Sequence, residues 1–243
     1  MLDNGIIRPS RSPMASPLVC VLKGKNGRDG VRLAVDYRYV NRFTRDDAYP
    51  LPDISSVFQR IGRCNFITVA DCKAGYWQIP MLEEDKWLTA FVCDAGLFEF
   101  NRAPFGLNGS GNTFVRAMDR ILYSLRKFTE SFVDDVIVHF HEWKEHMNHL
   151  DRFLAVIKKY GISLSLKMCR FAQSPVKVCG EIIRSGKRFT DHEKLQVVQK
   201  MKPPTTKTEV KRILGFFSYF KEHINDFADV VRPLTCKCGP TTY

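Results

Sequence analysis

Short apolar runs separated by turn residues dominate the N-terminal half of the chain. Residues 18–22 and 31–35 are rich in β-forming side chains, and the segment 23–30 between them is basic and rich in glycine. This pattern predicts a β-hairpin with a positively charged tip. A second hairpin is predicted within residues 87–101, and the Pro- and Ser-rich residues 1–17 are expected to form an extended lead-in.

Helical periodicity appears in the later part of the chain. Apolar residues recur at helical spacing in 112–127 and again in 145–160, where Gly161 follows as a stop signal. Thr206 and Glu209 have the spacing of a capping box, which predicts a helix start in the C-terminal part. We therefore expect two long helices in the middle of the chain and a smaller helical unit at its end.

Two predicted strands in the middle of the chain carry carboxylates. Residues 66–70 form an apolar run that ends at Asp71, and the β-forming run 132–140 is interrupted by Asp134 and Asp135. Burying adjacent like charges is costly, so packing does not explain them. They fit either a simple hairpin turn or a divalent-cation site, since hard cations bind carboxylate oxygens. If both strands lie in one sheet, the carboxylates can converge at its edge.

Strands and helices follow one another without strict alternation, which favours an α+β fold over a doubly wound sheet. The chain of 243 residues is long enough to bury a hydrophobic core without disulfides. Its 37 Lys and Arg outnumber 26 Asp and Glu, which gives a net charge of +11. This excess favours a polyanionic partner, either nucleic acid or an acidic membrane surface. A basic chain with convergent carboxylates indicates nucleotidyl transfer on nucleic acid through two metal ions.

The cysteines and the N-terminus predict an intracellular protein of the cytoplasm or nucleus. Most of the eight cysteines lie in apolar segments, and the N-terminus has no signal-peptide pattern. No apolar run approaches the ~18 residues of a membrane span. Cys236 and Cys238 form a lone C-x-C, and the histidines at 139, 141, 146 and 149 fit no standard zinc spacing, so zinc is not predicted.

The chain resembles the reverse transcriptase of LTR retrotransposons, most closely the gypsy-type elements. Each motif alone is weak, but many of them occur in the family's order along nearly the whole chain. The matching segments are 5–10, 16–19, 32–38 with Asn41, 49–52, 71–79, 104–107, 132–135, 167–169 with Phe171, 179–180, 214–216 with 219–220, and 232–234. The segment 71–79 resembles the first catalytic motif, and 132–135 resembles the metal-binding Y-x-D-D hairpin.

The resemblance implies a right-hand polymerase of the α+β class, with an antiparallel palm sheet and helices. It places the fingers at 1–48 and 79–110, the palm at 49–78 and 111–186, and a partial helical thumb at 187–243. No RNase H domain is expected, and the usual first fingers helix is expected to be missing or shortened. The Lys-rich thumb is expected to contact the backbone phosphates of a duplex.

The resemblance also implies a set of site residues. Asp71 and Asp134 would be the main ligands of two Mg²⁺ ions, with Asp135 beside them and Mn²⁺ as a substitute. These three carboxylates would serve the attack of a primer 3′-hydroxyl on the α-phosphate of a nucleotide.

Five further residues match the nucleotide pocket of the family. Arg32 matches an arginine on the triphosphate, and Lys25 in the basic tip is a second candidate for a phosphate contact. Tyr76 matches the aromatic residue beneath the sugar, where its ring would collide with a 2′-hydroxyl. Phe105 and Gly106 match the floor of the pocket. From the residues alone, Arg32 equally fits a solvent-facing strand position and Tyr76 a core aromatic.

The implied function is an RNA-directed and DNA-directed DNA polymerase that extends a primer on an RNA or DNA template with deoxynucleoside triphosphates. The alternative is an inactive retroelement remnant that binds nucleic acid without turnover. A third possibility, an RNA-templated RNA polymerase, conflicts with Tyr76. Two departures from the family stand out: Phe132 replaces the usual Tyr, and segment 108–112 holds two extra glycines, which are expected to loosen the start of the following helix. The sequence leaves the oligomeric state open.

Overall fold

The computed structural model confirms the α+β class. It describes residues 1–22, 30–45, 47–50, 53–178, 181–184, 187–190, 196–198, 200–201 and 203–238. The chain divides into two compact units, one of residues 1–176 with 183–187 and one of residues 177–182 with 188–243. The boundaries of fingers, palm and thumb stay predictions. Within the described residues, no helix combines the length and apolar character that crossing a membrane requires.

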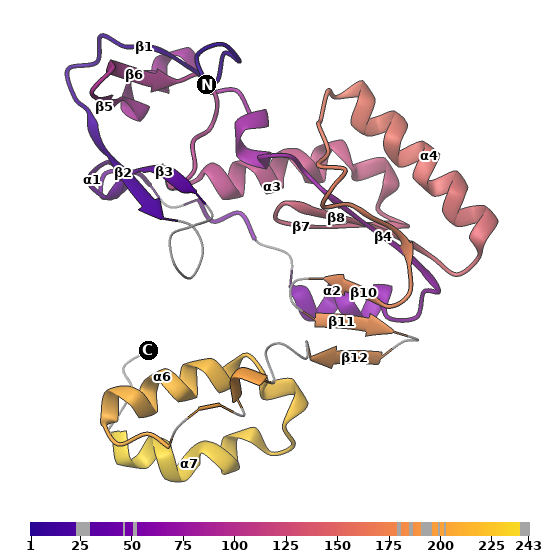
Figure 1. Cartoon of the computed structure of the whole chain (residues 1–243). Coiled ribbons are helices and arrows are strands. Elements are labelled where there is room, and N and C mark those ends of the chain that lie inside the picture. Colours follow the sequence, from indigo (N-terminus) through magenta and orange to yellow (C-terminus); the bar gives the residue numbers. More distant parts are fainter. Residues whose placement is uncertain are drawn as a thin grey trace. The chain divides into compact units, whose positions relative to one another are not determined.

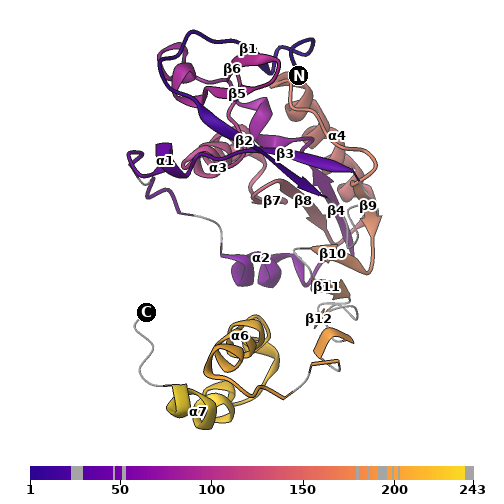
Figure 2. The ribbon, with the colours of Figure 1, turned by 60° about the vertical axis from the view of Figure 1, so that its left-hand side comes forward.

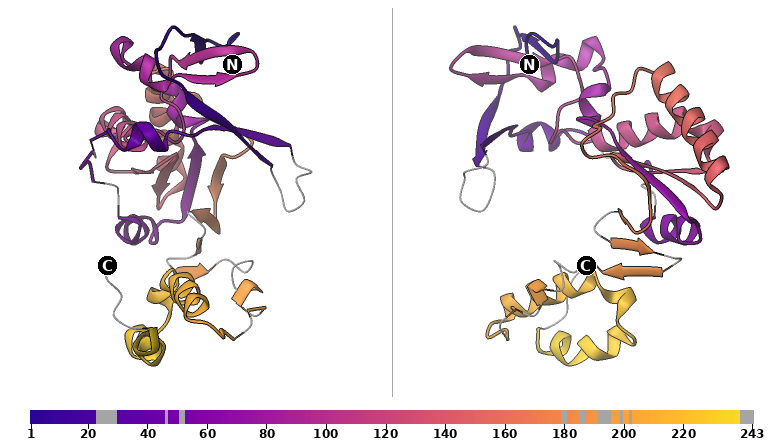
Figure 3. Two further views of the ribbon diagram at one scale, coloured as in Figure 1. Left: turned by 90° about the vertical axis from the view of Figure 1, so that its left-hand side faces the viewer. Right: turned by 45° about the vertical axis from the view of Figure 1, so that its right-hand side comes forward.

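A five-stranded sheet forms one part of the first unit. Its strands are β1 (Ile7–Pro9), β2 (Ser16–Leu22), β3 (Val31–Val35), β5 (Phe91–Cys93) and β6 (Gly96–Phe100), in the order β1-β6-β5-β2-β3. Both predicted hairpins are present, since β2 pairs with β3 and β5 with β6 in antiparallel register. The β2–β3 hairpin projects from the unit (Figure 3). The predicted lead-in is partly wrong, because its backbone pairs with β6 to form β1.

A four-stranded sheet forms the other part of the first unit, apart from β1, β5 and β6 (Figure 2). Its strands are β4 (Phe66–Asp71), β7 (Thr129–Phe132), β8 (Asp135–Phe140) and β9 (Arg170–Gln173), in the order β7-β8-β4-β9. The β-forming run 132–140 is divided, because the chain turns between β7 and β8, which agrees with the hairpin that the sequence left open for Asp134 and Asp135. This sheet carries the three carboxylates.

The two long helices predicted in the middle of the chain are present but shifted at their ends. The first unit contains α1 (Arg38–Asn41), α2 (Ile54–Ile61), α3 (Ser110–Ile121) and α4 (Trp143–Lys159), with 3₁₀ turns η1 (Gly75–Gln78), η2 (Glu83–Thr89) and η3 (Tyr123–Leu125). The C-terminal part holds α6 (Lys207–Ser218), η4 (Lys221–His223) and α7 (Phe227–Cys238). The strands β10 (Val176–Val178), β11 (Glu181–Arg184) and β12 (Lys187–Thr190) form a sheet in that order.

Side-chain caps hold two of these helix starts, and the one at α6 was predicted. The Asp53 carboxylate accepts hydrogen bonds from the backbone N–H groups of Ser55 and Ser56 at the start of α2. Thr206 and Glu209 form the reciprocal pair of a capping box at the start of α6. The predicted helix 112–127 begins and ends earlier than expected, as α3.

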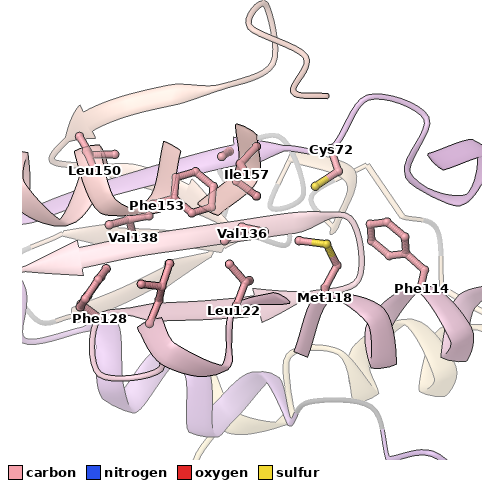
Figure 4. Packing of buried hydrophobic residues seen from close by; sticks show 12 residues of the cluster. Cys72, Phe114, Met118, Leu122, Phe128, Val136, Val138, Leu150, Phe153 and Ile157 are labelled. Carbon is pink, nitrogen blue, oxygen red and sulfur yellow. The ribbon is translucent and has the colours of Figure 1, made fainter. Parts of the chain in front are cut away.

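The main hydrophobic core lies between the second sheet and helices α3 and α4 (Figures 1 and 4). Val136 and Val138 of β8 are buried at its centre. Helix α3 contributes Phe114 and Met118, and α4 contributes Phe153, all of them buried. Both helices direct apolar residues at helical spacing towards the sheet. This packing fixes β8, and with it the carboxylates at the start of that strand.

Packing also accounts for two of the clustered histidines. His146 Nε2 lies 2.9 Å from the hydroxyl oxygen of Thr68, and both residues are buried. The His149 ring stacks on Phe128 with the ring centres 3.8 Å apart. Among the residues that the structure describes, no three His, Cys, Asp or Glu side chains are grouped so as to hold a metal ion without rearrangement.

His139 is buried on the other face of β8, since side chains alternate along a strand. Its Nδ1 lies 3.4 Å from Cys64 Sγ, and its Nε2 has no hydrogen-bond partner within the described residues. Burial, with a smaller contribution from the positive charge of Arg60, lowers the pKa of His139 from 6.5 to about 4. The folded chain therefore favours neutral His139.

We expect His139 to make the chain less stable in mild acid. The His139 ring takes up a proton more readily in the unfolded chain than in the folded one. Its contribution to stability is therefore complete above pH 6.5 and is lost as the pH falls towards about 4. At pH 5 the loss from His139 should be about 2 kcal/mol relative to pH 7. Urea unfolding at both pH values measures it. His139→Gln should reduce the pH dependence, whereas His141→Gln, at an exposed position, should keep it. Equal pH dependence in His139→Gln and wild type would contradict this account.

Candidate active site

The ends of two neighbouring strands bring the three carboxylates together. Asp71 is the last residue of β4, and Asp135 is the first residue of β8. The two are direct cross-strand partners in the antiparallel pair, so their side chains leave the same face of the sheet. Asp134 precedes β8 in the turn. The prediction that the two strands lie in one sheet, with their carboxylates at one edge, is confirmed.

The turn between β7 and β8 has an unusual backbone. Val133 has a φ of 52°, in the left-handed region that β-branched residues rarely adopt. Pairing of Phe132 with Asp135 closes the turn, and Cys72 N–H donates to the carbonyl oxygen of Asp134 at 3.0 Å. The surrounding strands therefore hold the turn in a strained conformation that presents Asp134 beside β4.

The electrostatics of the carboxylates favour a bound cation. Burial and the nearby charge of Asp71 raise the pKa of Asp134. Burial, Asp71 and Asp134 likewise raise the pKa of Asp135, which Arg170 partly opposes. Asp134 Oδ1 is buried without a hydrogen-bond partner in the described part of the chain. Repelling carboxylates with an unpaired oxygen have the chemistry that a hard divalent cation binds, although among the described residues they are not grouped so as to surround one.

Gly75 allows the Asp134 carboxylate to take this place. A Cβ atom on Gly75 would lie only 2.8 Å from Asp134 Oδ1 and 3.0 Å from Phe114 Cζ. Gly75 follows Ala74, whose φ of 48° turns the chain sharply after β4. Reasoning from the sequence did not identify Gly75 as a site residue. The signal that could have identified it is the presence of a glycine within the motif 71–79.

Tyr76 lies next to the carboxylates and among aromatic rings. Its ring centre is 4.9 Å from that of Phe105 and 5.8 Å from that of Phe114, which it meets edge-on. The ring is half-buried, and burial, together with the charge of Asp134, raises the pKa of the Tyr76 hydroxyl. Trp77 also packs edge-on against Phe105. The structure therefore brings Tyr76 and Phe105 together, as predicted.

Asn41 holds the loop that contains Gly106. Its Nδ2 donates to the Gly106 carbonyl oxygen at 2.9 Å, and its Oδ1 accepts from Asn108 N–H at 2.8 Å. Gly106 has a φ of 88°, which glycine adopts without strain. Asn41 belongs to a motif of the sequence resemblance, but its role as a loop support is visible only in the structure.

The two candidate phosphate contacts cannot be placed against the site. Lys25 lies outside the described residues. Arg32 occupies β3 opposite Val21 in the β2–β3 hairpin, and its side chain lies outside the description. Their contacts with a triphosphate stay predictions.

The two extra glycines of segment 108–112 play different parts at the start of α3. Gly109 is the N-cap residue, with a φ of 85°, and lies outside the helix interior. Only Gly111 lies within the helix, in its first turn. The interior cost of glycine therefore applies to Gly111 alone.

A separate cavity of about 710 Å³ lies beside the N-terminal end of α3. Most of its lining is apolar and includes Phe43, Met81 and Leu107. The three carboxylates do not line it. The chemistry of the candidate site is therefore at the sheet edge, outside this cavity.

Comparison with known proteins identifies the family of the chain. A family model described as reverse transcriptase (RNA-dependent DNA polymerase) matches residues 23–183. The Pol polyproteins of the transposons opus and gypsy from Drosophila melanogaster are each 36% identical over 97% of the chain. The enzymatic polyprotein of Cauliflower mosaic virus is 32% identical over 98% of the chain. The chain covers 24%, 23% and 35% of these three relatives.

Solved structures share the fold. A foamy viral protease-reverse transcriptase in complex with double-stranded DNA superposes with a TM-score of 0.87 and 23% identity, covering 97% of this chain and 48% of that one. The same viral protein in complex with an RNA/DNA hybrid gives a TM-score of 0.85, covering 97% of this chain and 31% of that one. The predicted right-hand polymerase fold is confirmed.

Proposed function

Because the chain belongs to the reverse transcriptase (RNA-dependent DNA polymerase) family, we propose that it extends a primer 3′-hydroxyl with deoxynucleotides on an RNA or DNA template. The observation that carries this proposal is the carboxylate edge, where Asp71 and Asp135 face each other and a buried oxygen of Asp134 has no hydrogen-bond partner among the described residues. The gypsy-type relatives support it at the level of the family.

Asp71 and Asp134 are the proposed ligands of two Mg²⁺ ions, with Asp135 beside them and Mn²⁺ as a substitute. Bound cations would supply activation of the primer hydroxyl and neutralisation of the phosphate charge. The carboxylates of this chain would place those charges at the sheet edge. Their mutual repulsion, seen in the raised pKa values of Asp134 and Asp135, is what cation binding would relieve.

The neighbouring residues would select and orient the nucleotide. Tyr76, with Phe105 and Gly106, would form the floor beneath the sugar and leave no room for a 2′-hydroxyl. Arg32 and Lys25 would contact the triphosphate as cations. These roles follow from the family motif, and the ring packing around Tyr76 supports the first of them.

The proposed partner is a primer–template duplex. The net charge of +11 supports a polyanionic partner, and the foamy viral structures contain double-stranded DNA and an RNA/DNA hybrid. Lysines of the C-terminal part, including Lys207 and Lys211 of α6, would contact backbone phosphates. Binding should weaken steeply as salt increases.

Primer extension on poly(rA)/oligo(dT) with Mg²⁺ or Mn²⁺ tests the function. We expect incorporation of deoxythymidine by the wild-type chain and none without a divalent cation. A folded chain that binds the duplex but extends no primer would support the inactive remnant instead. Preferential incorporation of ribonucleotides would support an RNA polymerase.

Tyr76→Ala should relax the choice of sugar. Without the ring, a 2′-hydroxyl meets no obstacle, so the preference for deoxynucleotides should fall by about tenfold or more. Single-nucleotide incorporation with matched deoxy- and ribonucleotides gives the ratio of kcat/KM values. Tyr123→Ala, at an exposed tyrosine of η3, should leave this ratio unchanged. If Tyr76→Ala keeps the wild-type preference for deoxynucleotides, Tyr76 does not contact the sugar of the nucleotide.

A further inference from the structure

Gly111 lies next to the hydroxyl end of the Tyr76 ring. A Cβ atom on Gly111 would lie 3.4 Å from Tyr76 Oη and 3.9 Å from Tyr76 Cζ. Gly111 is the second residue of α3, directly after Ser110. Because Gly111 has no side chain, the hydroxyl end of the ring faces helix backbone across a gap that a methyl group would fill at van der Waals distance.

The other neighbours of the Tyr76 ring give less room. Phe114 meets the ring edge-on at 5.8 Å and is fully buried in the main core, so the ring cannot move towards it without disturbing packing. Phe105 covers another side at 4.9 Å and is itself packed against Trp77. Among these three neighbours Gly111 is the one with open space beside the ring, so a push on Tyr76 is accommodated more cheaply there than against Phe114 or Phe105.

We propose that Gly111 is a positioning residue that sets the strength of sugar discrimination through Tyr76. This inference rests on the proposed function, in which the Tyr76 ring lies beneath the sugar of the incoming nucleotide. The 2′-hydroxyl of a ribonucleoside triphosphate presses on the ring, and the ring yields into the gap at Gly111. A methyl group in that gap holds the ring in place and strengthens the rejection of ribonucleotides.

Gly111→Ala in the full chain tests the proposal. We expect the ratio of kcat/KM for dGTP to kcat/KM for GTP on a templating cytosine to rise about fivefold. The change should arise mainly from a lower kcat/KM for GTP. Alanine favours a helix over glycine, so the variant should fold at least as well as the wild type. Thr113→Ala, at an exposed position of the same helix, should not alter the ratio.

A second background separates contact with the hydroxyl from a general effect on the helix. Tyr76→Phe removes Oη, the atom nearest to the added methyl group. In that background Gly111→Ala should leave the discrimination ratio within twofold of its starting value. An equal rise in both backgrounds, or no rise with Tyr76 present, would overturn the inference while leaving the polymerase function standing. A wild-type chain that incorporates no nucleotide would overturn both.

Discussion

Asp134→Asn is expected to abolish primer extension while the chain stays folded. The substitution keeps the shape of the side chain but removes the charge that would hold a divalent cation at the sheet edge. We expect the rate to fall by about a thousandfold or more, which corresponds to about 4 kcal/mol of transition-state stabilisation. Extension assays at saturating primer–template and nucleotide measure the loss.

The same substitution should not destabilise the metal-free chain. Ionised Asp134 is disfavoured by burial and by Asp71, which is why its pKa is raised. A carboxyl with a raised pKa costs stability as the pH rises through its folded value, so the neutral amide removes that cost. Thermal unfolding at neutral pH should therefore give a midpoint at or above that of the wild type.

Divalent cations provide a readout that does not depend on activity. Mg²⁺ or Mn²⁺ should raise the unfolding midpoint of the wild-type chain, because binding to the folded state alone stabilises it. The rise should be smaller in Asp134→Asn. Asp94→Asn, in the exposed turn between β5 and β6, is the matched control and should behave like the wild type in both assays. Extension that survives Asp134→Asn would show that the ligand assignment is wrong.

The sequence predicted the strands that carry the site better than the turn that shapes it. Alternation and apolar runs identified β4 and the β8 region, since both are buried against helices. A hairpin turn was one of the two interpretations of Asp134 and Asp135, but the left-handed backbone of Val133 was not predicted, because a β-branched residue with positive φ contradicts local propensity. Pairing with β4 and the hydrogen bond from Cys72 hold it there, and these contacts come from distant parts of the chain.

Two further differences have the same origin in tertiary contacts. Strand β1 is only three residues long and forms because β6 offers an open edge, which no local pattern in residues 1–17 reveals. The start of α3 depends on the left-handed conformation of Gly109, which caps the helix ahead of the first periodic apolar residue. The short hydrophobic pattern was therefore sufficient to predict that α3 forms, but not to predict where it begins and ends.

Gly75→Ala is expected to damage both stability and activity, although it adds only one methyl group. The new Cβ atom would lie 2.8 Å from Asp134 Oδ1, closer than real Cβ atoms essentially ever approach, and 3.0 Å from Phe114 Cζ, which is tighter than most Cβ contacts. Phe114 is fully buried, so it cannot retreat without disturbing the core. We expect a loss of about 1–3 kcal/mol in the free energy of unfolding. Displacement of the Asp134 carboxylate should lower kcat by about a hundredfold.

A control and a rescue make the steric origin of the Gly75→Ala effect testable. Gly215→Ala adds the same methyl group in α6 with no atom within 4 Å, and alanine should stabilise that helix by up to about 1 kcal/mol. Phe114→Leu removes the outer ring atoms near the new Cβ, so Gly75→Ala should cost less stability in that background than in the wild type. Activity should recover less than stability, because the clash with Asp134 persists. A Gly75→Ala chain with wild-type unfolding and extension would show that Asp134 does not lie against Gly75, and the geometry of the carboxylate edge would have to be revised.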